Sequence, residues 1–209
     1  MLAPALVVFG LALGAAATIL FVHDKQTELH LPAGVAASQV APSTVKPTTQ
    51  AVASYTVPAD NPKYLSIPAI KITDTRIIQL GLTKTHQIAV PDNVYDTGWY
   101  DASAEPGQNG AMFIYGHVSS WTVDGVFYNL KKLAVGDKIR VTRGDNRVFT
   151  YQVVTTKIYP HDNVDMNSVL APIDAKTPGL NLMTCTGKVI KGTSEFSERL
   201  VVFTSLVAG

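Results

Sequence analysis

The sequence lacks a second cysteine. Its 209 residues include one cysteine, Cys185. A single thiol cannot form an internal disulfide, so disulfides do not stabilise this fold. A lone cysteine is either a small buried residue or a reactive thiol, and its sequence neighbours must distinguish the two.

An excess of charge of either sign is also absent. The chain has 17 basic and 16 acidic residues, a formal net charge of +1. Nucleic-acid binding normally needs a concentrated basic face, so we expect no nucleic-acid partner. The sequence has no Gly-rich phosphate loop, and its five histidines show no short ligand spacing. We therefore predict neither a cofactor nor a metal.

Charged residues are missing altogether from Leu2 to Val22. A helix of this length can cross a hydrocarbon core of about 30 Å. A secretory signal peptide is the competing interpretation, but its apolar region is usually shorter, at about 7 to 15 residues. We expect residues 1–22 to form an uncleaved transmembrane signal anchor. Basic residues beside a membrane segment normally mark its cytoplasmic side. No Lys or Arg precedes this segment, so its orientation in the membrane cannot be read from its flanking charges.

The composition changes after the apolar segment. Residues 23–61 are rich in Ala, Pro, Ser, Thr and Val and show neither helical nor strand periodicity. Such sequence is typical of a partly extended, flexible linker. Residues 62–209 then have the length of one ordinary folded domain.

The folded domain is predicted to be mostly β. Ile139 and Val141 alternate with Lys138 and Arg140, the pattern of a half-buried strand. Short helices are expected at Val126–Leu133 and Val164–Leu170, and many short strands favour a barrel or a sandwich. The expected strands are Tyr64–Ile67, Ile70–Ile72, Ala111–Val118, Lys138–Arg143, Arg147–Tyr159, Leu180–Cys185 and Arg199–Leu206.

Three reactive side chains lie next to predicted strands. Cys185 ends one strand, His117 follows Gly116 at the end of another, and Arg199 begins the last. A cysteine with an ordinary pKa of about 8.5 is mostly a thiol at neutral pH, and a neighbouring imidazole or guanidinium favours the thiolate. Histidine can then protonate a leaving amine, and arginine can hold an oxyanion. Taken singly, each residue could instead be structural.

From about Asn61 to the C-terminus the chain resembles the sortases, surface transpeptidases of Gram-positive and related bacteria. Their nucleophile motif is Thr-Leu-x-Thr-Cys, and Leu182-Met183-Thr184-Cys185 matches its last four positions, with Asn181 in place of the usual Thr. Gly116-His117 matches the context of the family's histidine, and Arg199 matches the arginine of its last strand. The stretches Leu65–Ile70, Val94–Tyr100, Glu105–Gly110 and Val126–Leu130 agree in order, and the class F sortases look most similar.

The resemblance implies an eight-stranded sortase β-barrel with short helices, preceded here by the membrane anchor. It also implies attack by Cys185 on a sorting signal of the Leu-Pro-x-Thr-Gly type, with transfer of the acyl group to a peptidoglycan or pilin amine. His117 would be the general acid and base, Arg199 would hold the oxyanion or the signal, and Thr184 would assist substrate binding. Residues 159–178 would shape the signal groove. The expected location is the cell membrane, with the catalytic domain outside the cytoplasm.

Two alternatives stay open from the sequence. An L,D-transpeptidase also uses Cys and His on a β-rich domain, but its Ser-His-Gly element before the cysteine is replaced here by Asn181-Leu182-Met183-Thr184. The other alternative is an inactive, membrane-tethered binding domain that keeps the fold.

Overall fold

The computed structural model describes residues 31–37 and 41–209. The transmembrane segment expected at residues 1–22 lies outside these ranges. Within them, no helix has both the length and the apolar character needed to span a bilayer.

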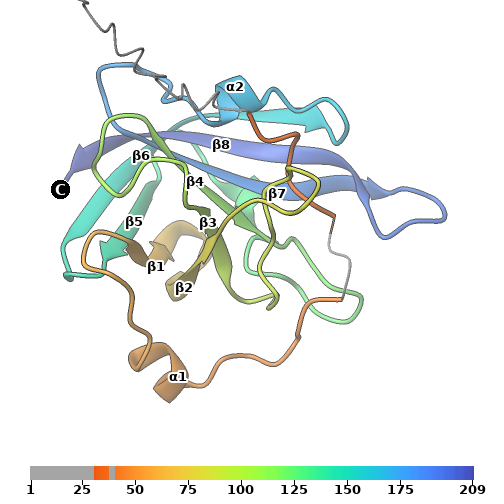
Figure 1. Cartoon of the computed structure of the whole chain (residues 1–209), viewed down its shortest axis with the longest axis horizontal. Coiled ribbons are helices and arrows are strands. Elements are labelled where there is room, and N and C mark those ends of the chain that lie inside the picture. Colours follow the sequence, from red (N-terminus) through yellow and green to blue (C-terminus); the bar gives the residue numbers. More distant parts are fainter. Residues whose placement is uncertain (1–30, 38–40) are drawn as a thin grey trace, which may run out of the picture. The chain divides into compact units, whose positions relative to one another are not determined.

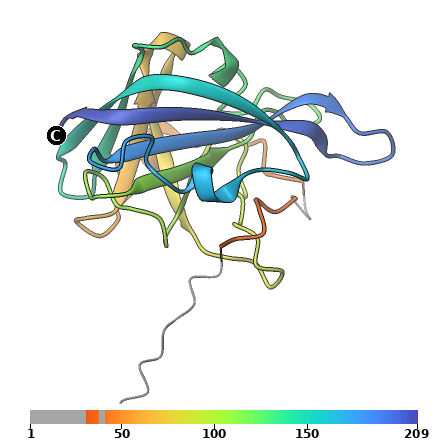
Figure 2. The same cartoon turned by 90° about the horizontal axis from the view of Figure 1, so that it is seen from above.

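The domain is a closed barrel of eight strands in the order β1-β2-β3-β4-β7-β8-β6-β5 (Figures 1 and 2). Two neighbouring pairs, β2–β3 and β4–β7, are parallel, and the other pairs are antiparallel. The strands are β1 Pro62–Ile67, β2 Ile72–Leu80, β3 Thr97–Tyr100, β4 Ala111–Gly116, β5 Lys138–Arg143, β6 Val148–Pro160, β7 Gly179–Val189 and β8 Phe196–Ala208. The helices are short: α1 Thr49–Ala53, α2 Met166–Val169, and the 3-10 turns η1 Pro68–Ile70 and η2 Leu130–Lys132. The predicted mostly-β barrel is confirmed.

Side-chain alternation explains how the strands face the core. In β5, Ile139 and Val141 are fully buried while Lys138 and Arg140 are exposed, as predicted. The strand β4 differs, because all six of its residues are buried. Met112 and Ile114 belong to the main core, whereas Phe113 and Tyr115 belong to a second apolar cluster that includes residues of α2. A strand buried on both faces reads as a continuous apolar run.

Some predicted boundaries are wrong, and local backbone geometry explains them. Ile70–Ile72 is not one strand, because Pro68 starts a 3-10 turn and Lys71 adopts a left-handed conformation with φ of 60° before β2 begins. The two-turn helix expected at Val126–Leu133 is reduced to η2. The helix expected at Val164–Leu170 is present as the shorter α2.

The strap segment, residues 31–37 and 41–45, runs beside the loop before β3. The N–H groups of Ala33 and Ala36 donate to the carbonyls of His86 and Ile88, at 2.9 and 2.8 Å. Ser43 continues the pairing, since its N–H donates to the Asp92 carbonyl at 2.7 Å. The segment is drawn in red to orange in Figure 1. These residues fall in the predicted linker, so at least this part of it contacts the barrel.

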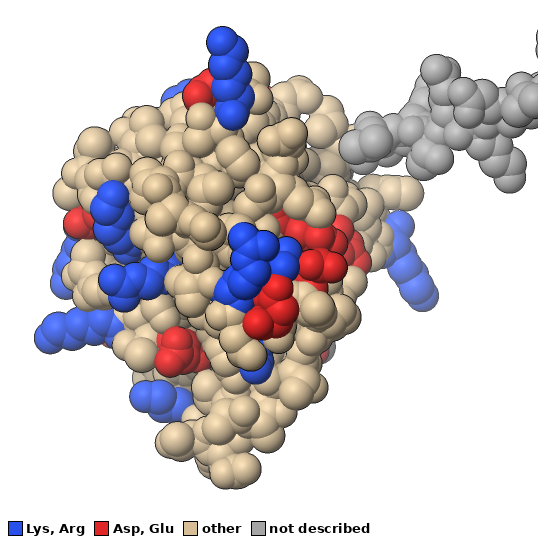
Figure 3. Space-filling model, turned by 90° about the vertical axis from the view of Figure 1, so that its left-hand side faces the viewer, with Lys and Arg blue, Asp and Glu red and all other residues tan. Residues whose placement is uncertain are grey.

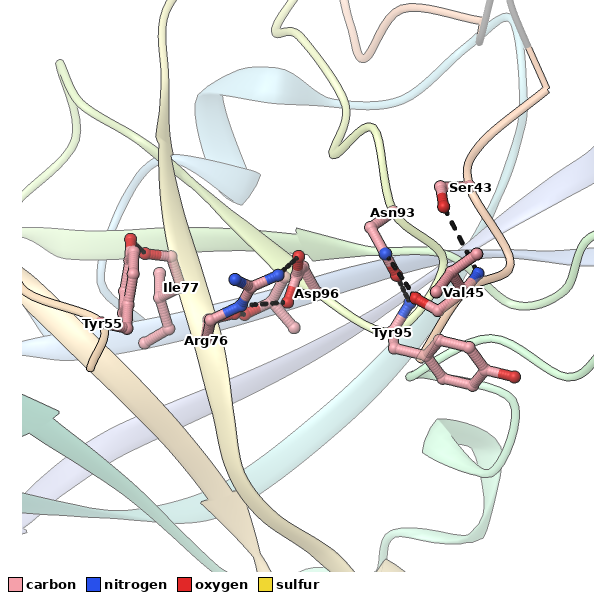
Figure 4. A network of polar contacts seen from close by, with 9 residues as sticks. Ser43, Val45, Tyr55, Arg76, Ile77, Asn93, Tyr95 and Asp96 are labelled. Atoms are coloured by element: carbon pink, nitrogen blue, oxygen red, sulfur yellow. Dashed lines mark hydrogen bonds and ion pairs between the residues drawn. The ribbon is translucent and has the colours of Figure 1, made fainter. Parts of the chain in front are cut away.

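Two side-chain contacts fix the chain just before β3 (Figure 4). Arg76 makes a two-point contact with Asp96, with Nε–Oδ1 and Nη2–Oδ2 distances of 3.0 and 2.6 Å. Asn93 donates from Nδ2 to the carbonyl of Val45 at 2.9 Å, which anchors the end of the strap segment. Both contacts hold the approach to β3, and hence the position of its neighbour β4.

The surface charge is mixed. On the face shown in Figure 3, basic and acidic side chains are interspersed among larger uncharged areas, and neither sign forms a continuous stripe. This face offers no basic track for a nucleic-acid backbone.

Candidate active site

Cys185 lies on β7, where that strand loses one of its neighbours. The last paired residues of β4 and β7 are Tyr115 and Met183, and β4 ends at Gly116. Cys185 is therefore paired on one side only, with Arg199 of β8 directly opposite it. The sequence predicted that β7 would end at the cysteine, but the strand continues to Val189. The half-buried thiol gains its access from the end of β4 rather than from the end of its own strand.

His117 immediately follows β4 and is 7% exposed. Its Nε2 lies 2.8 Å from the carbonyl oxygen of Pro91. A carbonyl only accepts, so Nε2 carries the proton and, in the neutral ring, Nδ1 is left as the acceptor. Burial lowers the pKa of His117 from its ordinary value, against smaller opposing effects of the Pro91 hydrogen bond and the Asp92 charge. The resting imidazole is thus neutral at pH 7 and can accept a proton.

Arg199 is also 7% exposed, although it is permanently charged. Its Nη1 donates to the carbonyls of Phe196 and Glu198, at 2.9 and 3.1 Å. Those two bonds fix the guanidinium through the backbone of β8 itself. Nε and Nη2 make no hydrogen bond with the described part of the chain, so three of the five N–H donors remain for a ligand.

Cys185, His117 and Arg199 all line one pocket of about 320 Å³. Much of its wall is formed by Ser194 and Glu195 of the β7–β8 connection, by Phe196 at the start of β8, and by Ser119–Trp121 after His117. Ala36 and Pro42 of the strap segment complete the wall. The fold therefore gathers the three residues that the sequence placed in separate motifs.

Thr184 faces away from that pocket. Its side chain is almost fully buried, and Oγ1 donates to the carbonyl of Gly116 at 2.7 Å. This bond joins β7 to the end of β4 just beyond their last backbone pair. Thr184 and Cys185 both line a second, smaller cavity of about 150 Å³.

Gly116 allows close packing of its neighbours and does not leave an open space. A Cβ at this position would lie 2.5 Å from the Phe127 ring and 2.8 Å from a Val126 methyl group. The loop after His117 folds back tightly, with the Phe127 N–H donating to the His117 carbonyl at 2.9 Å.

Two residues near the site were missed by sequence reasoning. Tyr115 brings its hydroxyl oxygen to 3.1 Å from Cys185 Sγ. Asn181 donates from Nδ2 to the carbonyls of Val169 and Ala171, at 2.8 and 2.9 Å, and so ties the segment around α2 to β7. In sequence Asn181 was only a departure from the family motif, and Tyr115 was only an apolar strand residue. Neither partner is near in sequence, so no local pattern could have revealed these contacts.

Metal-binding groups are not clustered near the site. Across residues 31–37 and 41–209, no group of three or more His, Cys, Asp or Glu side chains is arranged to hold a metal ion.

Comparison with protein families identifies the domain. The Sortase domain family matches residues 65–207, most of the chain, including all three pocket residues. The chain belongs to the sortase family. Sortases are cysteine transpeptidases, so this sortase is an enzyme of that type and not the L,D-transpeptidase considered from the sequence.

Solved sortase structures share the fold. A pilus-related sortase C of group B Streptococcus has a TM-score of 0.56 at 21% identity, covering 86% of this chain and 80% of its own. The sortase D5 transpeptidase of Clostridium perfringens has a TM-score of 0.52 at 24% identity, covering 76% and 86%. Sortase A of Corynebacterium diphtheriae has a TM-score of 0.51 at 24% identity, covering 69% and 60%. No curated protein matches the chain.

Proposed function

We propose that this sortase cleaves an LPxTG-like sorting signal in surface proteins and joins the acyl part to an amine of the cell wall or a pilin. The observation that carries the proposal is the single pocket onto which Cys185, His117 and Arg199 open. A thiol, a neutral imidazole and a fixed guanidinium are the groups that acyl transfer through a thioester needs.

In the first step the Cys185 sulfur attacks a backbone carbonyl of the signal. The S–C bond forms, the peptide C–N bond breaks, and the amine leaves with a proton from His117. In the second step the acceptor amine attacks the thioester and gives a proton to His117, which is neutral again after the first step. An amide forms, the S–C bond breaks, and its electron pair returns to sulfur. His117, neutral in the resting site, is suited to taking the thiol proton and returning it to the leaving amine.

Arg199 has the role of holding the oxyanion or the signal. Two backbone carbonyls fix its guanidinium beside Cys185, so the remaining donors need little reorganisation during reaction. Thr184 is proposed to assist substrate binding indirectly, since its hydroxyl is committed to the Gly116 carbonyl and sets the spacing of β7 and β4.

The remaining assignments rest on the sequence. We propose a class F-like sortase, although the structural relatives are of classes A, C and D. Residues 1–22 would anchor the enzyme in the cell membrane, and the residues after them would place the catalytic domain outside the cytoplasm.

The decisive experiment offers the full-length enzyme Leu-Pro-x-Thr-Gly peptides with hydroxylamine or diaminopimelate as the amine. We expect a thioacyl adduct by mass spectrometry and an amide product, both absent from Cys185→Ala. A peptide with the same residues in scrambled order is the substrate control.

The opposite result is equally clear. If the enzyme is folded and Cys185 is reduced, yet no sorting peptide gives an adduct, the proposed function is wrong. The domain would then be the inactive binding module considered from the sequence.

A further inference from the structure

The hydroxyl of Tyr115 is directed at the reactive sulfur. Tyr115 lies on β4, two residues before His117, and its Oη is 3.1 Å from Cys185 Sγ. Its ring also meets the His117 ring edge-on, with the centroids 5.9 Å apart. The tyrosine thus touches both proposed catalytic side chains.

The hydrogen-bond partner of the Tyr115 hydroxyl is the Cys185 sulfur. Tyr115 is 4% exposed, and among the described residues its hydroxyl makes no other hydrogen bond. A buried phenol hydroxyl normally has a partner, because leaving it unpaired costs free energy. Packing alone would be satisfied by phenylalanine, so the hydroxyl itself requires an explanation.

The direction of the hydrogen bond follows from the protonation states. Burial is the main reason that the pKa of Tyr115 is raised well above its ordinary value. The charge of Cys185 and the hydrogen bond to it raise the pKa further, and the charge of Arg199 opposes them only partly. The phenol therefore keeps its proton at neutral and moderately alkaline pH. A thiolate has no proton to give, so in that state Tyr115 must be the donor.

We propose that Tyr115 is a further catalytic residue, whose O–H donates a hydrogen bond to the Cys185 sulfur and stabilises it as thiolate. This inference rests on the proposed role of Cys185 as nucleophile. The donor acts twice: it favours the thiolate before attack, and it stabilises the sulfur when the acceptor amine displaces it from the thioester. It also fixes the direction of the Sγ atom before attack.

The other ionisable groups that share a cavity with the sulfur come from four segments. His117 follows β4, Arg199 lies on β8, and Glu195 lies in the β7–β8 connection and lines the same pocket. The strap segment contributes only Ala and Pro side chains to that pocket. Tyr128 and Lys131, just before and in η2, line the smaller cavity with Cys185. Because Tyr115 adds no charge, removing its hydroxyl leaves all of these charges in place.

The test is the pH dependence of Cys185 alkylation by iodoacetamide in the full-length enzyme, which needs no substrate. For Tyr115→Phe we expect the half-maximal pH to rise by about one unit and the rate at pH 7 to fall about tenfold. The matched control is Tyr151→Phe, which also removes a buried hydroxyl, one that accepts from the Gly107 N–H at 3.0 Å inside the barrel. It should lower stability and leave the half-maximal pH unchanged.

A second substitution protects the test against misfolding. Fluorotyrosine at position 115 keeps the ring shape, and its more acidic hydroxyl is a stronger donor, so the half-maximal pH should fall. If neither change at position 115 moves the half-maximal pH beyond the Tyr151→Phe value, the inference is wrong and Tyr115 only packs. If the shifts occur but no sorting peptide is cleaved, the inference stands and the proposed function fails.

Discussion

At the scale of single residues, the site combines a buried base with a buried cation. His117 and Arg199 are equally inaccessible, yet burial acts on them differently. The imidazole can shed its charge, so its pKa is lowered. The guanidinium cannot, so it is stabilised by hydrogen bonds to the backbone. The pocket thereby holds a neutral base beside a fixed positive charge.

The lowered pKa of His117 predicts a loss of stability in acid. Below about pH 6.5 this histidine is protonated in the unfolded chain, while in the folded chain it stays neutral until the pH falls further. The free energy of unfolding should therefore fall as the pH falls from about 6.5 to the folded pKa, and then level off. Urea unfolding between pH 5 and 7.5 measures this, and His117→Gln should flatten the curve.

The control for that measurement is His86→Gln, at an exposed histidine of the loop before β3. It should leave the slope of the wild-type curve intact. Equal slopes for wild type and His117→Gln would show that His117 is not the titrating group.

Arginine at position 199 should not be replaceable by lysine. Lysine keeps the charge but lacks the planar fork that holds two carbonyls while presenting further donors to a ligand. We expect Arg199→Lys to lower kcat/KM for a sorting peptide about a hundredfold, as loss of an oxyanion donor does. The exposed Arg140→Lys on β5 is the control, and a melting curve checks the fold of both variants. If Arg199→Lys turns over the peptide at a near-normal rate, Arg199 acts through its positive charge and not through its planar set of donors.

At the scale of elements, the unequal lengths of β4 and β7 create the site. β4 stops at Gly116 while β7 continues to Val189, so the thiol lies beside an unpaired strand edge. The strap segment then covers part of the pocket and pairs with the loop that leads to β3. Access to Cys185 is thus set by β4, which is too short to pair with it, and by the strap segment, which lines part of its pocket.

Weakening the strap segment should expose the thiol. Ala36→Pro removes the N–H that donates to the Ile88 carbonyl at 2.8 Å, a bond worth about 1 kcal/mol. Alkylation of Cys185 by iodoacetamide should then become roughly fivefold faster. Ala36→Ser, which keeps the N–H and nearly the same volume, is the matched control. If the two variants react at the same rate, pairing of the strap segment does not limit access.

At the scale of the whole molecule, the closed barrel includes a parallel pair, β2–β3, whose connection over residues 81–96 contains no helix. Residues of β2 and β3 pair in parallel, and the Arg76–Asp96 contact fixes the approach to β3. Asp96 is almost completely buried, and its carboxylate receives both donors of the guanidinium edge. Buried ion pairs of this geometry are costly to break from one side.

Removing the Asp96 carboxylate should therefore lower global stability. We expect Asp96→Ala to reduce the free energy of unfolding by about 3 kcal/mol, because the mostly buried guanidinium of Arg76 loses its carboxylate partner. Urea unfolding followed by circular dichroism measures the loss. Asp145→Ala, which breaks the more exposed contact with Arg143, is the control and should cost much less. Equal losses would mean that burial of the Arg76–Asp96 pair is unimportant.

The sequence alone determined the kind of domain and pointed to three residues that the structure brings to one pocket. Period-two alternation fixed β5 and β6, and the motifs around Gly116-His117, Thr184-Cys185 and Arg199 were readable because they are local. It could not determine where β4 ends relative to Cys185, nor that Tyr115, 70 residues earlier, meets the sulfur. Parallel pairing of β4 with β7 decides both, and pairing between distant strands leaves no trace in local periodicity. The same holds for the strap segment, whose composition resembles a linker but whose backbone pairs with a loop about 50 residues away.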